Sequence, residues 1–133
     1  MAEQMVSVKK TYGAPHKDVV LAPHLAFAIP VQVGNTGVSV NSEGKKIIPA
    51  GTPIGGTVSA LETRDTILTV TNSSTTGTNA QGILRYEVDV TAGAVNATML
   101  VFGFVDTSKC PTIDASVKTA LAGRITFING GAY

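Results

Sequence analysis

Hydrophobic and polar positions alternate along this chain in short runs, the pattern of half-buried β-strands. The clearest run covers residues 82–90. Its apolar face comprises Leu84, Tyr86, Val88 and Val90, and its polar face comprises Arg85, Glu87 and Asp89. Residues 97–105 are apolar on both faces, which predicts a central strand covered on both sides. Further strands are predicted at residues 25–33, 54–61, 66–71 and 124–128.

Turn-forming residues separate these runs. Residues 34–37, Gly-Asn-Thr-Gly, lie between two valine-rich segments and predict a hairpin loop. A second break is predicted at residues 41–44 and a turn around Gly93. Residues 72–82 are small or polar and predict a mobile loop.

One short helix is predicted, at about residues 114–122. Its apolar stripe has helical spacing and comprises Ile113, Val117, Ala120 and Leu121. Thr112 or Asp114 can cap its start, and Gly123 can take the left-handed position after its end.

The first 24 residues lack a clear periodicity. Pro15 and Pro23 exclude a continuous helix, and Ala-Pro-His occurs twice, at residues 14–16 and 22–24. We therefore predict an extended N-terminal arm at 1–24 and a single β-rich domain at 25–133. The predicted fold class is mainly β, a small barrel or sandwich-like domain with one short helix near the C-terminus.

Composition narrows the possible functions. Of 133 residues, 44% are hydrophobic and only 14% are charged, so part of the surface is expected to face other protein. A net charge of +1 and a 5% aromatic content disfavour binding to nucleic acid. No apolar run is long enough to span a membrane. No secretory signal pattern occurs at the N-terminus, which predicts synthesis in a reducing cytoplasm.

The search for catalytic or metal-binding chemistry identifies no site. Cys110 follows Lys109, which can lower a thiol pKa, but no histidine is placed to act as its base, so a half-buried structural thiol is preferred. His16 and His24 lack metal-site spacing. Glu87 and Asp89 share a strand face with Arg85, which favours a cross-strand charge network over an acid/base pair. We expect no catalytic residues, metal or cofactor.

A set of motifs in residues 46–128 has a recognisable order. The segments are Lys46–Pro53 (KIIPAGTP), Gly82–Leu84 (GIL), Glu87–Gly93 (EVDVTAG), Val101–Val105 (VFGFV) and Ala120–Ile128 (ALAGRITFI). This series resembles the head decoration and head fibre-base proteins of tailed double-stranded DNA bacteriophages, most closely the lambda-type capsid decoration proteins. The resemblance covers about two-thirds of the chain and does not extend to the proline-rich arm.

The resemblance implies a compact β domain of the β-tulip type that forms a homotrimer. It implies binding to the major capsid protein on the outer surface of the virion, at three-fold or quasi-three-fold positions, and an arm that becomes ordered on the shell. The residues expected in the arm contact are Met5, Val6, Ser7, Val8, Lys9, Lys10 and Tyr12. Their alternation suits addition of a strand to an exposed sheet edge.

Two other functions remain open. One is a different structural role in the virion, such as a head fibre base, tail or head-completion component. The other is a β-sandwich module that binds glycans or peptides, for which the chain has few aromatic residues.

Overall fold

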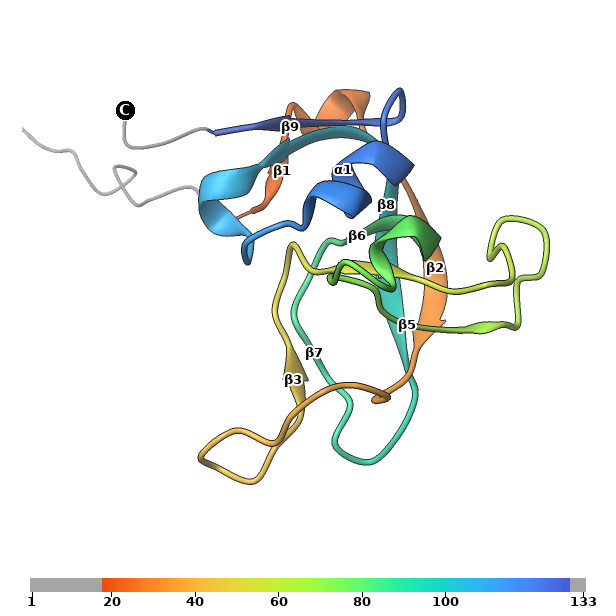
Figure 1. Cartoon of the computed structure of the whole chain (residues 1–133), viewed down its shortest axis with the longest axis vertical. Coiled ribbons are helices and arrows are strands. Elements are labelled where there is room, and N and C mark those ends of the chain that lie inside the picture. Colours follow the sequence, from red (N-terminus) through yellow and green to blue (C-terminus); the bar gives the residue numbers. More distant parts are fainter. Residues whose placement is uncertain (1–17, 130–133) are drawn as a thin grey trace, which may run out of the picture.

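A computed structural model describes residues 18–129. Within this range the fold is mainly β, as predicted, with 37% of the residues in strands and 13% in helices. Strands surround the long strand β8 (Val95–Asp106), and the one α-helix of the described residues, α1 (Ala115–Ala120), lies beside its second half (Figure 1). The short helix predicted near the C-terminus is thereby confirmed.

Five strands close into a barrel. They are β2 (Phe27–Val33), β5 (Ile67–Val70), β4 (Pro53–Gly55), β6 (Ala80–Leu84) and β8. Each pairs with the next in this order, and β8 pairs with β2 to complete the ring. All of these pairings are antiparallel except β2–β5, which is parallel. A closed ring leaves these strands few free edges, which is the usual way in which small β domains avoid edge-to-edge association.

Strand β8 continues beyond the barrel and organises the rest of the domain. Its second half pairs with β1 (Val20–Leu21) and, in parallel, with β9 (Ile125–Ile128). A separate two-stranded ladder joins β3 (Ile47–Ile48) to β7 (Val88–Asp89). Among residues 18–129 there are also three single turns of 3-10 helix: η3 (Pro23–Leu25), η4 (Gly77–Asn79) and η5 (Thr107–Lys109).

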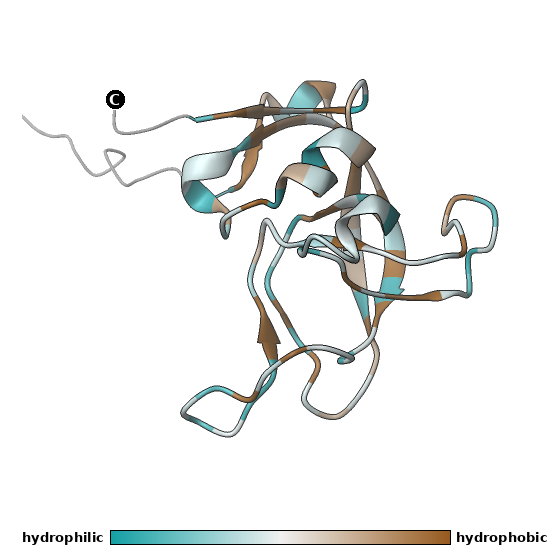
Figure 2. Cartoon of the chain, viewed as in Figure 1, coloured by the Kyte–Doolittle hydropathy of each residue, from teal (hydrophilic) through white to brown (hydrophobic). Residues whose placement is uncertain are grey.

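Two hydrophobic cores lie on opposite faces of β8. Met99 and Val101 point into the barrel core, whereas Leu100 points into a second core beneath α1, β1 and β9. Phe27 pairs with Phe102 and Ala28 with Leu100, so Val101 is an extra residue on β8, a β-bulge. In Figure 2 the hydrophobic colouring gathers along the strands and the hydrophilic colouring on the loops between them.

The helix forms as its sequence predicts. The Asp114 carboxylate accepts hydrogen bonds from the backbone N and the hydroxyl of Ser116, which caps the first turn. Val117 and Leu121 are fully buried in the second core. Gly123 has φ 85°, the left-handed conformation that ends a helix with little strain in glycine.

Three local predictions are wrong. Residues 34–37 do not form a hairpin, because β2 already has β8 and β5 as its two neighbours and residues 38–40 form no strand. Residues 82–90 do not form one strand: β6 ends at Leu84 and β7 begins at Val88, with Tyr86 exposed between them. Residues 72–82 are not a loop throughout, since η4 and the start of β6 lie there, with Gly77 and Ala80 buried.

Strand lengths also differ from the prediction. The run at residues 54–61 yields only β4, and residues 57–66 form a loop. Strand β8 is central, as predicted, but Phe102 on it is exposed. Residues 18–24 belong to the predicted arm, yet they supply β1 and the fully buried side chains of Val19 and Val20.

Candidate interaction surface

The residues expected to contact a capsid shell are Met5, Val6, Ser7, Val8, Lys9, Lys10 and Tyr12, and all lie outside the described residues. The structure does show where this segment joins the domain. Asp18 accepts a hydrogen bond from the backbone N of Val20 at 3.0 Å and forms a salt bridge with Arg85 at 3.0 Å. The first described residue is therefore held to the barrel through a charged pair.

Strands β1 and β2 lie along the same edge of β8 and are interrupted by a short excursion. Leu21 pairs with Phe104, and Phe27 pairs with Phe102. A continuous antiparallel ladder would place residue 23 opposite Phe102, so four extra residues (27 − 23) are inserted. Ala22 takes the left-handed conformation with φ 50°, and η3 follows it. The chain thus leaves the sheet, forms one turn of helix and returns.

This excursion borders an exposed apolar surface, which we call the Phe27–Phe102 face and define as Leu25, Phe27 and Phe102. These side chains are 52%, 58% and 50% exposed. Phe27 and Phe102 are direct cross-strand partners, an arrangement in which two side chains lie close together on one face of a sheet. Exposed aromatic side chains are enriched at protein interfaces. The Phe27–Phe102 face is therefore the candidate contact surface that the described residues offer.

This surface was not predicted from the sequence, because residues 97–105 were expected to be covered on both sides. A signal was nevertheless available, since the chain has only four phenylalanines and two of them lie here. His24, within the excursion, is exposed. Among residues 18–129, no group of three or more His, Cys, Asp or Glu side chains could hold a metal ion.

Cys110 is half-buried, as predicted, and packs in the second core. Its thiol donates a hydrogen bond to the Asp106 carbonyl oxygen at 3.3 Å. Burial, with a smaller contribution from the negative charge of Asp106, raises the thiol pKa to about 11. Lys109 lies 3.3 Å from the Asp106 carboxylate. The thiol is therefore protonated at neutral pH and unsuited to nucleophilic attack.

The charge network predicted for Arg85, Glu87 and Asp89 forms only in part: Arg85 makes a long-range salt bridge, whereas the two carboxylates form no salt bridge among the described residues. Arg85 turns to Asp18, and its guanidinium also lies over the Tyr86 ring, 5.3 Å from the ring centre. Asp89 instead accepts hydrogen bonds from the hydroxyl and the backbone N of Thr91, which lower the pKa of its carboxyl group. Arg85 and Asp89 therefore serve different contacts: Arg85 binds a distant residue, whereas Asp89 stabilises a local turn. They do not share a strand face, because β6 ends before Arg85 and β7 begins only at Val88.

Comparison with known proteins finds no family model that matches the chain and no curated protein that is similar to it. Within residues 18–129, no helix is long and apolar enough to cross a membrane.

Proposed function

We propose that this chain is a non-catalytic capsid decoration protein, made in the host cytoplasm and bound as a trimer to the outer surface of a tailed-phage head. The observation that carries the proposal is the Phe27–Phe102 face on a small barrel of low charge. Such a face is suited to a protein partner, since exposed aromatic side chains that lie close together are typical of protein interfaces. The ordered motifs, which resemble those of lambda-type decoration proteins, support the major capsid protein as the partner.

The proposed mechanism uses two contacts. The N-terminal segment binds a neighbouring shell subunit, and the Phe27–Phe102 face packs on the shell close to the root of that segment. One segment binds weakly because ordering it costs entropy. Three segments on one trimer raise the avidity about 10²–10⁴-fold where the lattice spacing lets all three engage. The trimer then holds adjacent capsid subunits together in the expanded, DNA-filled shell.

The test is co-sedimentation of the purified chain with undecorated expanded capsids. Saturable binding at physiological salt is expected, with hundreds of copies per particle, and a stoichiometry of a few copies would favour the connector or fibre-base role. The double variant F27S/F102S should weaken binding at least tenfold, since central aromatic anchors dominate interface energies. Val40→Ser is the matched control, because Val40 is 58% exposed but lies away from this face, in the segment between β2 and β3. No binding by the unaltered chain would refute the proposal.

Two further measurements test the N-terminal contact and the trimer separately. Deleting residues 1–10 should weaken capsid binding and leave the folded domain unchanged by circular dichroism. Light scattering should give a mass of about three times 13.7 kDa. A monomer at every concentration would restrict trimer formation to the shell.

A further inference from the structure

A groove of about 310 Å³ lies on the outer face of the barrel, over β5. Its floor is formed by Thr69 and Thr71 and is bordered by Ile67; the three residues alternate along the chain and so share one face. The residues between them, Leu68 and Val70, pack into the barrel core. The floor is therefore the outward surface of a paired strand, backed by a rigid core.

Two walls rise from this floor, one at residues 57–58 and the other at Thr76 and Asn79. The Gln81 side chain fixes the first wall by donating to the carbonyl oxygens of Gly56 (3.1 Å) and Val58 (2.7 Å). Its amide oxygen also accepts from the Ala60 backbone N at 2.8 Å. The base of loop 57–66 is thus held against β6.

The two chain segments that carry these walls come close together at Gly55. A Cβ atom at this position would collide with the Asn79 carbonyl oxygen and lie 2.8 Å from the Gln81 backbone N. Glycine is required here by the close approach of the two chain segments. The groove is therefore a preformed feature, closed at one end by backbone.

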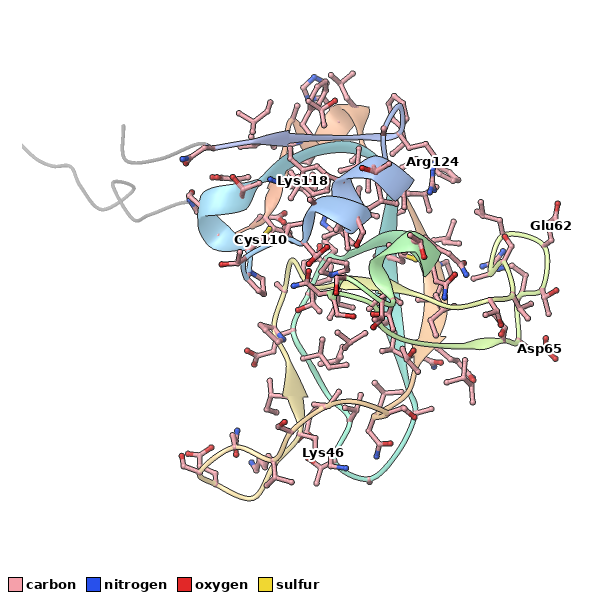
Figure 3. All side chains as sticks on the ribbon, in the orientation of Figure 1. Lys46, Glu62, Asp65, Cys110, Lys118 and Arg124 are labelled. Atoms are coloured by element: carbon pink, nitrogen blue, oxygen red, sulfur yellow. The ribbon has the colours of Figure 1, made fainter. Side chains whose placement is uncertain are left out.

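The lining is rich in hydrogen-bonding groups and contains no charged side chain. Its polar members are Thr57, Thr66, Thr69, Thr71, Thr76 and Asn79. Glu62 and Asp65 belong to loop 57–66, which carries the first wall, but they lie at the outer end of this loop and do not line the groove (Figure 3). Val58 and Ile67, 44% and 53% exposed, add an aliphatic border. An ionic ligand would find no counter-charge in this lining.

Thr71 supplies an independent indication of a ligand. It is only 2% exposed, and its hydroxyl group has no hydrogen-bond partner among the described residues. Buried hydroxyl groups almost always have a partner, so an unpartnered one at the floor of the groove points to a polar group that the groove receives.

We propose that this groove binds an uncharged saccharide unit. Hydroxyl and amide side chains both donate and accept hydrogen bonds, which matches the hydroxyl groups around a sugar ring. The aliphatic border can cover the C–H face of the ring. An added peptide strand is disfavoured, because β5 is already paired on both sides, by β2 and β4, and offers no free edge. This site does not depend on capsid binding.

The experiment is an NMR titration of the full chain with neutral mono- and disaccharides, followed through backbone amide shifts. Saturable shifts confined to residues 55–58, 66–71 and 76–79 are expected at millimolar sugar. The double variant T69V/N79A should weaken binding about tenfold, which corresponds to the loss of one or two hydrogen bonds. Thr126→Val, an exposed threonine on β9, is the control and should bind as the unaltered chain does.

Other outcomes would overturn the proposal. These are the absence of shifts with every neutral sugar, shifts centred elsewhere on the domain, tighter binding of sialylated or sulfated glycans than of neutral ones, and binding of neutral peptides without binding of sugars. Capsid co-sedimentation of the same variants should be unchanged, so failure at this groove is distinguishable from failure of the decoration function.

Discussion

Asp18 and Arg85 form a salt bridge, with 3.0 Å between Oδ2 and Nη2, that joins the first described residue to the residue following β6. Their side chains are only 24% and 20% exposed. The Arg85 backbone N also donates to the Thr98 carbonyl oxygen at 3.0 Å. Arg85 therefore anchors both the start of β1 and the end of β6 on the sheet around β8.

Arg85→Met should lower the free energy of unfolding by about 1–2 kcal/mol, because it leaves the Asp18 carboxylate half-buried without its cation. A double-mutant cycle with Asp18→Asn should give a coupling energy of about 1 kcal/mol in urea denaturation. Lys118→Met, an exposed cation on α1, should change stability by less than about 0.5 kcal/mol. A coupling energy near zero would show that the pair contributes no stability.

Gly55→Ala should destabilise the domain by about 2–3 kcal/mol or prevent folding, because its Cβ atom would collide with the Asn79 carbonyl oxygen. Gly56→Ala is the matched control. A Cβ atom there would meet only Leu68 Cδ2, at 3.8 Å, which is ordinary contact. Thermal denaturation should place Gly56→Ala close to the unaltered chain, and equal losses for both variants would contradict the assigned close approach.

Thr71→Val should leave stability unchanged or raise it by about 1 kcal/mol, because it removes a buried hydroxyl group that has no partner among the described residues. Thr52→Val should instead lower the free energy of unfolding, because it removes a hydrogen bond. Thr52 is also buried, but its hydroxyl donates to the Pro49 carbonyl oxygen at 2.7 Å. Urea midpoints of the two variants should move apart, and a clear destabilisation by Thr71→Val would reveal a partner for its hydroxyl.

Stability should decline between about pH 9 and pH 11 through Cys110. The pKa of the thiol is raised from 9.0 to about 11 in the folded protein. The contribution of the protonated thiol to the free energy of unfolding is therefore complete below pH 9, and it is lost as the pH rises through the pKa of the folded state. Cys110→Ala should remove this part of the decline in urea titrations at pH 8 and 10.5. Alkylation of Cys110 at pH 8 should be slower than that of a free cysteine, and equal rates would contradict the raised pKa.

The elements best predicted from the sequence are those determined by local chemistry. The helix, its Asp114 cap and Gly123 each depend on neighbours a few residues away. The central position of β8 follows from a run that is apolar on both faces. The absence of aromatic residues from the groove lining likewise follows from a composition poor in Trp, Tyr and Phe.

The elements that were mispredicted depend on distant partners. The loop signal at residues 34–37 gave no indication that β2 pairs in parallel with β5, a pairing that joins Gln32 to Ile67. Gly82 was predicted both to end the polar loop and to begin the strand at residues 82–90, yet it lies inside β6, paired with Ile54. Glycine is needed there because a side chain would collide with the Leu100 carbonyl oxygen, a contact that only the tertiary structure reveals. The Phe27–Phe102 pair is likewise a product of register, which alternation within one strand cannot show.

The excursion at residues 22–26 has a consequence for how this domain tolerates change in length. The ladder with β8 is intact on both sides of it, at Leu21 and at Phe27, so the number of residues between these points is not constrained by strand register. Pro23, His24 and Leu25 are all exposed. A foreign peptide of several residues can therefore replace them without shifting either strand. Because Leu25 belongs to the Phe27–Phe102 face, such a replacement would also alter the surface proposed to contact the shell, so length at this turn affects binding rather than folding.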